Sequence, residues 1–333
     1  MDRPVERRLV AMVGGDSLLA KEIRELLGES EPATRVQLIS AAPDGTSLLS
    51  LEEEDASVLI PLNAESLEGA SVAFLAGSQA SSRRALKLNP DGGPVLIDLA
   101  GALEEQPNAR LRAPKAEPRG GASETGAISV IAHPAAIALA LVLSSVARAG
   151  VIRRSVVHVF EPASERGQRG IEELQQQTVA VLNLQKLKQD VFDAQAAFNM
   201  LARYGEEALE PLEGIEQRLE RHLASLLSAW PGLPMPSLRL IHAPVFHGHS
   251  FSLWIEMDDA PQVAPISAAL SEAGIDVRPD EPPNNVGVAG FSGVSVGAIA
   301  TDNNNPRALW LWAVADNLRV AAENAVAVAQ EVW

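Results

Sequence analysis

Residues 8–29, RLVAMVGGDSLLAKEIRELLGE, decide how the first half of the chain folds. Residues 8–15 are a short apolar run that ends in two glycines, which is typical of a buried strand and a tight turn. Residues 17–29 then show the apolar spacing of an amphipathic helix. A strand, a glycine turn and a helix in this order predict a parallel sheet with crossover helices. The turn also places a helix N-terminus where an anionic phosphate could bind.

Further short apolar runs continue this pattern, and each is closed by a glycine or a small polar residue. They lie at residues 35–40, 56–62, 71–78, 94–101 and 128–132. We expect each run to be a strand, and we expect residues 109–124, which are rich in Pro, Gly and charge, to form a loop. The first part of the chain is therefore predicted to be an α/β domain with a parallel sheet.

From residue 151 the pattern changes to that of an α+β domain with a mostly antiparallel sheet. Residues 151–164 alternate like a strand with one open face, and residues 238–257 are predicted to form a long strand pair. The remaining elements are helices at 170–185, 213–230 and 266–274, a strand at 293–302, and one long apolar helix over 309–332.

Composition limits the classes of function. The sequence holds 43 Asp and Glu against 27 Lys and Arg, for a net charge of −16, which repels nucleic-acid phosphates and anionic membranes. It contains no cysteine, which excludes disulfides, thiolate metal sites and thiol nucleophiles. The first residues lack the apolar segment of a signal peptide, so we expect a cytoplasmic protein without nucleic-acid or membrane partners.

The uncharged run at residues 125–147 is long enough to suggest a membrane span. His133 and Pro134 near its middle, and the lack of aromatic residues at either end, argue against a span. We expect a buried strand followed by a buried helix whose first turn holds Pro134.

Residues 13–20 are the first candidate site. A strand, a turn and a helix form the frame of a dinucleotide site, and Gly14 holds the first position of its glycine fingerprint. Ser17 and Ala20 stand at the other two positions, and both are small enough for a backbone to approach a pyrophosphate. An ordinary strand-to-helix turn is the alternative.

His242, His247 and His249 are the second candidate. On a strand, His247 and His249 would share one face and His242 would face the other way. A general acid or base role for one of them is plausible, and solvent-facing strand residues are the alternative. No Asp or Glu lies near them in the sequence to complete a metal site, so we expect none.

Two polar segments remain. The loop at 160–174 follows a strand, where sites often lie, although a solvated loop and helix cap explain it equally well. Residues 315–319 interrupt an apolar helix, so they need either hydrogen-bond partners or a ligand.

In this order and spacing, these segments resemble the aspartate-semialdehyde dehydrogenase family over nearly the whole chain. The strongest pieces are PVFHGHS (244–250), GIEELQQQ (170–177), AFNM (197–200), and LWAVADNLR (311–319) followed by AAENAV (321–326). The resemblance implies a Rossmann-like NAD(P)-binding domain and an α+β domain for catalysis and dimerisation. The family reduces β-aspartyl phosphate with NADP through a cysteine thiolate, with a histidine as acid and base.

Carried over residue by residue, the resemblance implies that part of the site is retained. His249 matches the acid–base histidine, Glu173 matches the glutamate of the helix that orders the site, and Asn317 matches an asparagine beside the nicotinamide. Gly14 and Gly77 fall at cofactor-binding positions.

Other positions depart from the family pattern. Ala136 stands at the nucleophile, Glu161 at the orienting glutamine, and His242 and Glu104 at two arginines that bind substrate or phosphate. On the helix of Glu220, a further substrate-binding position, Leu223 stands at the phosphate lysine, and Ala42 and Pro43 stand where the 2′-phosphate of NADP would bind. The pattern is similar to the Usg-type paralogues of the family, which lack the catalytic set.

The resemblance therefore predicts two domains, 1–133 with a C-terminal helix at 309–333, and 134–308. We expect a homodimer without the family's usual activity, with weakened binding of NADP or NAD. The alternatives are a reductase acting on another carbonyl with His249 as acid–base, and a structural or regulatory partner of an active relative.

Overall fold

The structure is a computed structural model that describes residues 8–31, 33–42, 48–52, 55–117 and 128–333. The chain divides into two compact units. Unit 1 comprises Met1–Ala132 with Ala321–Trp333, and unit 2 comprises His133–Val320. Each unit is described by itself.

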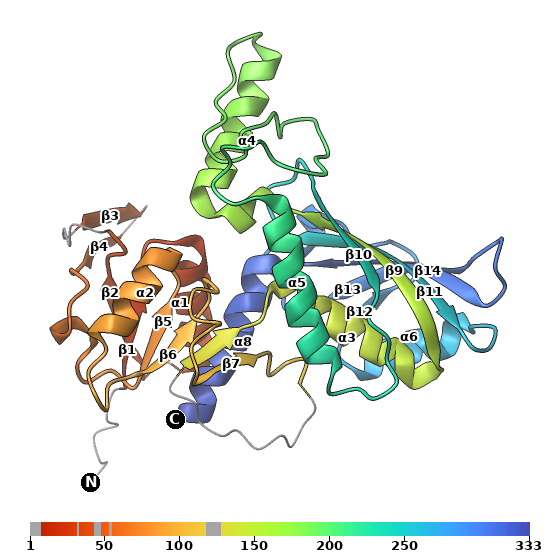
Figure 1. Cartoon of the computed structure of the whole chain (residues 1–333), viewed down its shortest axis with the longest axis horizontal. Helices are drawn as coiled ribbons and strands as arrows, with labels where there is room; N and C mark the ends of the chain where they lie inside the picture. The colour runs from red at the N-terminus through yellow and green to blue at the C-terminus, as the bar shows by residue number, and fades with distance from the viewer. Residues whose placement is uncertain (1–7, 32, 43–47, 53–54, 118–127) are drawn as a thin grey trace. The chain divides into compact units, whose positions relative to one another are not determined.

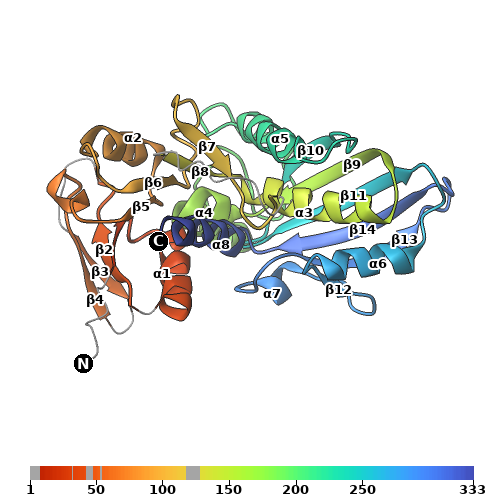
Figure 2. The same cartoon turned by 90° about the horizontal axis from the view of Figure 1, so that it is seen from below.

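Unit 1 contains a six-stranded, fully parallel sheet with the order β2-β1-β5-β6-β8-β7 (Figures 1 and 2). The strands are β1 (Leu9–Val13), β2 (Arg35–Ile39), β5 (Val72–Leu75), β6 (Val95–Asp98), β7 (Ala109–Arg112) and β8 (Ile128–Ile131). Helices α1 (Leu18–Ser30) and α2 (Gln79–Leu88) follow β1 and β5, and η1 (Glu65–Leu67) is a short 3-10 turn. Central strands such as β5 are wholly buried, which explains their unbroken apolar runs.

Two predictions in unit 1 are wrong in part. The strand predicted at 56–62 is confirmed as β4 (Asp55–Leu59), but it pairs antiparallel with β3 (Leu48–Glu52) in a separate two-stranded sheet, and Ile60 makes only a single bridge to Ile39. The predicted loop at 109–124 begins with β7, an edge strand of the parallel sheet. Its Ala-Arg-Leu-Arg sequence suits an edge strand, where long charged side chains can reach water. Residues 118–127 lie outside the described residues.

Unit 2 contains a mixed sheet with the order β10-β9-β11-β14-β13-β12. Its strands are β9 (Ile152–Glu161), β10 (Ser237–His242), β11 (His249–Met257), β12 (Asp276–Arg278), β13 (Ser295–Thr301) and β14 (Ala308–Ala315). The edge strands β10 and β12 pair parallel with their neighbours, and the interior junctions are antiparallel. The predicted strand pair at 238–257 is therefore two strands separated by β9.

The helices of unit 2 are α3 (Pro134–Ala149), α4 (Gly167–Leu182), α5 (Leu212–Leu227), α6 (Val263–Glu272) and the short α7 (Asn285–Val288), with the 3-10 turn η2 (Ala163–Arg166). Helix α3 packs between α5 and α6 against the sheet, whereas α4 projects away from it (Figure 1). The predicted strand and helix at 128–149 are confirmed as β8 and α3, with Pro134 at the first helical position. Among the described residues, the structure contains no helix with the length and apolarity to cross a membrane.

The predicted helix at 309–332 is wrong in its first third. Residues 308–315 form β14, which pairs with β11 and β13 and belongs to unit 2. The helix α8 (Asn317–Val332) begins only after Asp316, whose carboxylate accepts hydrogen bonds from the backbone N–H groups of Leu318 and Arg319. An aspartate in this capping position sets where a helix starts.

Candidate functional site

The N-terminus of α3 is the starting point of the site. His133 is the N-cap: its Nδ1 accepts a hydrogen bond of 3.2 Å from the backbone N–H of Ala135. The backbone N–H of His133 donates to Nδ1 of His222 on α5 at 2.9 Å. Ala136, which the resemblance places at the nucleophile, is fully buried in the first turn of α3.

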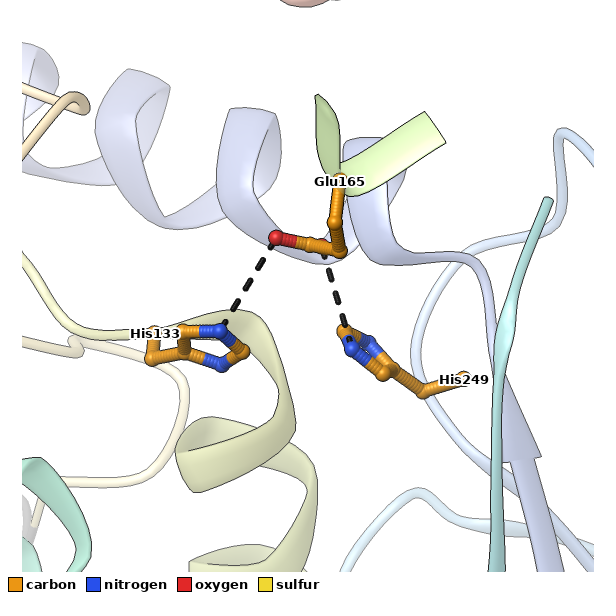
Figure 3. A group of neighbouring side chains, drawn as sticks. All are labelled: His133, Glu165 and His249. Carbon is orange, nitrogen blue, oxygen red and sulfur yellow. Dashed lines mark ion pairs between the residues drawn. The ribbon is translucent and has the colours of Figure 1, made fainter. Parts of the chain in front are cut away.

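His133, Glu165 and His249 form what we call the histidine cluster (Figure 3). The Nε2 atoms of His133 and His249 lie 3.8 and 3.9 Å from the two carboxylate oxygens of Glu165. The three residues come from the cap of α3, from η2 and from the first position of β11. Both Nε2 atoms are buried and have no hydrogen-bond partner among the described residues.

Asn317 holds the carboxylate of Glu165 in place. Its side-chain amide donates to Oε1 of Glu165 at 2.9 Å. Its carbonyl oxygen accepts from the hydroxyl of Ser164 and the backbone N–H of Gly248, each at 3.0 Å. Asn317 therefore links the start of α8 to η2 and to the turn before β11, beside the cluster.

A second group of charged side chains begins at the residue after Glu165. We call it the ion network, and it consists of Arg166, Glu161, Glu210 and Arg218. Arg166 pairs with Glu161 at 3.0 Å and with Glu210 at 2.5 Å, and Arg218 pairs with the other oxygen of Glu210 at 3.0 Å. Glu161 is wholly buried. Each charge thus meets an opposite one, as buried ions require.

His242 is linked to Glu161 through Tyr204. The hydroxyl of Tyr204 donates to Glu161 at 3.3 Å and lies 3.0 Å from Nδ1 of His242. The imidazole of His242 also packs against the ring of Phe192, with centroids 4.6 Å apart and ring planes tilted by 44°. The position that the resemblance assigns to a substrate arginine is therefore filled by a neutral ring in an aromatic environment.

Burial dominates the electrostatics of this region. It lowers the pKa of His249 and of His242 to about 4 and holds the pKa of His133 well below its usual range. Burial also raises the pKa values of Glu161 and Glu165, although Arg166 opposes the rise in both. The three imidazoles are therefore neutral near pH 7 and present lone pairs rather than positive charge.

Glu173 has a structural place on α4. Its carboxylate accepts hydrogen bonds from the backbone N–H groups of Val191 and Phe192, at 2.7 and 3.2 Å. One turn later, Gln177 accepts from Ala196 and Ala197. Together these two side chains fix the segment that carries Phe192, the ring under His242.

In unit 1, the turns after β1 and β5 meet closely. Gly14 has φ +80°, and a Cβ there would lie 2.4 Å from the Cα of Gly77. Ser17 caps α1 by accepting from the backbone N–H of Ala20 at 3.1 Å. Because β2 and β5 flank β1 on opposite sides, these glycines lie where the strand order reverses, the usual place of a nucleotide in an open α/β sheet.

The remaining predicted residues lie elsewhere. Glu104 is half-buried in the turn after β6, where Asp98 accepts from the backbone of Leu103. Glu220 is half-buried on α5, and Leu223 is fully buried there. The α5 residues that reach the site are Arg218 and His222.

The solvent-facing alternative for the histidines is wrong, because His242 and His249 are buried. His247 precedes β11 and is half-buried, so it does not share a strand face with His249. The structure instead joins His249 to His133 and Glu165. The polar loop at 160–174 pointed to Glu165 and Arg166, but no spacing in the sequence linked either residue to His133.

Comparison with known proteins agrees with this architecture. The family model for the semialdehyde dehydrogenase dimerisation domain matches residues 143–320 of this chain. The chain is 31% identical to a USG-1 protein homolog of Azotobacter vinelandii over 96% of both chains, and 27% identical to an aspartate-semialdehyde dehydrogenase of Prochlorococcus marinus over 99% of this chain and 96% of the relative. The solved structure of a probable aspartate-semialdehyde dehydrogenase from Pseudomonas aeruginosa has 26% identity and a TM-score of 0.85 over 98% of both chains.

The chain therefore belongs to the semialdehyde dehydrogenase family, among the relatives of aspartate-semialdehyde dehydrogenase and the USG-1 proteins. Within that family its site combines neutral imidazoles, a buried carboxylate and a buried ion network. Such a set can move protons or bind a cation, but its residues offer no sulfur nucleophile.

Proposed function

We propose that this chain is a homodimeric, nucleotide-binding member of the family that does not carry out the family's thiol-dependent reaction. The observation that carries the proposal is Ala136, at the position where the resemblance places the catalytic cysteine, in a sequence that holds no cysteine. A methyl group cannot attack a carbonyl. Loss of a nucleophile lowers turnover by something on the order of 10⁴–10⁶-fold.

The ion network supports the same conclusion. Glu161 stands at the orienting glutamine and is paired with Arg166, so its carboxylate is already engaged. His242 stands at a substrate arginine, and its neutral ring cannot form the two parallel charged hydrogen bonds that a guanidinium gives a carboxylate. An anionic substrate such as β-aspartyl phosphate would lose attraction at both positions.

Unit 1 favours retained nucleotide binding. An aspartate-semialdehyde dehydrogenase from Candida albicans, which shares the fold, was solved with NADP. Gly14 and Gly77 let the turns after β1 and β5 pack against each other at the strand-order reversal, where a pyrophosphate would bind, and Ser17 caps α1, the helix that follows. Ala42 and Pro43 replace the family's contacts to the 2′-phosphate, and Pro43 lies outside the described residues. Arg84 remains nearby, since its guanidinium donates to the carbonyls of Ala41 and Ala42 just after β2. We expect weak binding of NADP or NAD there.

A turnover assay tests the lost activity. Pure protein is incubated with aspartate semialdehyde, phosphate and NADP, and NADPH formation is followed. We expect no phosphate-dependent signal from the wild type. Ala136→Cys should gain a small activity that the matched Ala136→Ser lacks, because only the cysteine supplies a thiolate. Robust phosphate-dependent turnover by the wild type would refute the proposal.

Cofactor binding and assembly need separate measurements. Titration calorimetry should detect millimolar or tighter binding of NADP, and Arg84→Ala should weaken NADP more than NAD because it removes charge near the 2′-phosphate position. Light scattering should give twice the chain mass of 35.3 kDa. A monomer would contradict the proposed homodimer. Failure to bind either nucleotide would contradict the proposed nucleotide binding.

His249 favours a second function, a reductase acting on a less anionic carbonyl. Its neutral Nε2 lies 3.9 Å from Glu165, so the pair could exchange a proton with a substrate oxygen. Hydride transfer from a nicotinamide needs an acid–base group and no thiol. The wild type should then oxidise NADPH with some member of a panel of aldehydes, and His249→Gln should do so more slowly. Failure of the chain to bind either nucleotide would exclude this reductase function.

The dimerisation domain leaves room for a third role, as the structural or regulatory mate of an active relative. Co-purification with that relative from native extract would favour this role. Recovery of a homodimer alone would count against it.

A further inference from the structure

We propose that His133, Glu165 and His249 form a binding site for one divalent transition-metal ion, with Zn²⁺ as the best match. The argument starts from the donor atoms. Two imidazole nitrogens and a carboxylate converge from three different elements, and both nitrogens are buried without a partner among the described residues (Figure 3). Buried polar atoms are nearly always paired in native proteins, so these two call for an explanation, as do Oε2 of Glu161 and Nε of Arg166 nearby.

The spacing fits a single ion. One ligand atom from each residue lies within 4.8 Å of the others, so a common point exists no more than about 2.8 Å from each. Zinc bonds to nitrogen and oxygen ligands are about 2.0–2.2 Å long. Each side chain would therefore move inward by less than about 1 Å, which small rotations supply.

The surrounding charges leave one carboxylate for a cation. The rings are neutral, and the charges that act most strongly on Glu165 and His249 are the carboxylates of Glu161, Glu210 and Asp316 and the guanidinium groups of Arg166 and Arg218. On His133, the same two guanidinium groups act. Both arginines are already engaged with Glu161 and Glu210, so Glu165 is the carboxylate left facing the imidazoles.

The residues behind the donors hold them rigidly. Asn317 fixes Glu165 by a hydrogen bond of 2.9 Å to Oε1, and Oε2 faces His133. The backbone N–H of His133 donates to His222, and His249 begins β11 between β9 and β14. Such supporting contacts orient metal ligands and are typical of real sites.

Binding has one identifiable cost. Nδ1 of His133 accepts from the backbone N–H of Ala135, so the proton of this neutral ring is on Nε2. Ligation through Nε2 of a neutral ring requires this proton to move to Nδ1, which removes the acceptor of Ala135. The lost bond is the side-chain cap of α3, and an N–H group at a helix terminus can turn to water or to another acceptor after a small shift.

The donor set narrows the chemistry of the ion. Imidazole nitrogens suit zinc and the neighbouring first-row metals, whereas magnesium and calcium prefer oxygen ligands. Three protein ligands leave at least one coordination position for water or a substrate oxygen. That arrangement is typical of catalytic rather than structural zinc sites.

Zinc binding to the full chain tests the proposal. The protein is freed of metal with a chelator, and Zn²⁺ is titrated against a competing indicator dye. We expect one Zn²⁺ per chain with a Kd on the order of 1 μM or tighter, and a rise of Tm with zinc. Co²⁺ as a probe should give visible absorption bands that excess Zn²⁺ removes.

Three variants assign the site. His133→Asn removes the imidazole ligand but can still cap the helix. Glu165→Gln keeps the shape of the side chain and removes its charge. His249→Gln replaces the imidazole ligand with a neutral amide. Each should weaken zinc binding by about 100-fold or more, with unchanged circular dichroism. His247→Asn, two residues from His249, is the control and should bind as the wild type does.

Two results would overturn the proposal. One is the absence of stoichiometric binding at about 100 μM Zn²⁺, which is far above the expected Kd. The other is equal binding by the wild type and all three folded variants, which would place the zinc elsewhere. The measurement reads zinc rather than turnover, so it stands or falls independently of the proposed loss of dehydrogenase activity.

Discussion

The ion network and the histidine cluster occupy adjacent parts of unit 2 but handle buried charge in opposite ways. In the network, Arg166 neutralises Glu161 and Glu210 within hydrogen-bond distance. In the cluster, Glu165 faces two neutral rings at 3.8 and 3.9 Å, too far for a hydrogen bond. Glu165 and Arg166 are consecutive residues, so one turn of chain serves both. The comparison separates carboxylates that are held by guanidinium groups from a carboxylate that faces neutral imidazoles, and the two arrangements should respond differently to substitution.

The largest expected effect comes from breaking the network. Arg166→Met leaves Glu161 and Glu210 without their shared cation, and Glu161 is wholly buried. Removing one member of a buried ion pair costs about 3–5 kcal/mol. We expect the free energy of unfolding, measured by urea denaturation, to fall by that amount.

Arg239 provides the matched control. It pairs with Glu216 at 3.2 Å, but most of its side chain is exposed, so solvent screens the interaction. Arg239→Met should change the free energy of unfolding far less than Arg166→Met. Equal effects of the two substitutions would mean that burial of the network adds nothing to stability.

The next largest effect is a pH dependence of the free energy of unfolding, caused by His242. The folded-state pKa of His242 is about 4, because burial and Arg166 oppose its charged form. The unfolded chain therefore takes up the proton first as the pH falls, and stability present above about pH 6.5 is lost toward pH 4. Between pH 7 and pH 5, the wild type should lose about 2 kcal/mol more than His242→Gln. Parallel pH curves for the two proteins would show that His242 titrates normally.

The smallest effect is expected in the cluster. Glu165→Gln keeps an oxygen that can accept from Asn317 while it removes a buried charge. Without zinc, the free energy of unfolding should change by no more than about 1 kcal/mol. The contrast with Arg166→Met, one residue away, separates a ligand-binding role from a stabilising one. A loss as large as that of Arg166→Met would join Glu165 to the network.

Local patterns predicted most elements but not their partners. The runs at 71–78, 94–101 and 128–132 became strands of the parallel sheet because they are mostly apolar and their strands are buried along nearly their whole length. The run at 56–62 has the same composition, yet residues 55–59 pair with β3 outside that sheet. Strand pairing depends on which backbone groups meet in space, and composition carries little information on that.

The C-terminal segment illustrates a second limit. Residues 309–315 are apolar throughout, and periodicity alone does not separate a buried strand from a buried helix. These residues form a strand because they pair with β11 and β13, and the cap at Asp316 sets where α8 begins. The sequence did contain the capping signal, Asp316 followed by Asn317, within the predicted helix.

The sequence by itself determined the α/β and α+β halves, the family resemblance, and the absence of a thiol, since these depend on residue identity and local spacing. It also determined that Ala136 follows a helix start at Pro134. Only the tertiary structure decided that His133, Glu165 and His249 converge, because they are separated by 32 and 84 positions along the chain. Side chains so far apart meet only when β9, β11 and α3 pack, and packing also supplied the burial that makes both histidines neutral.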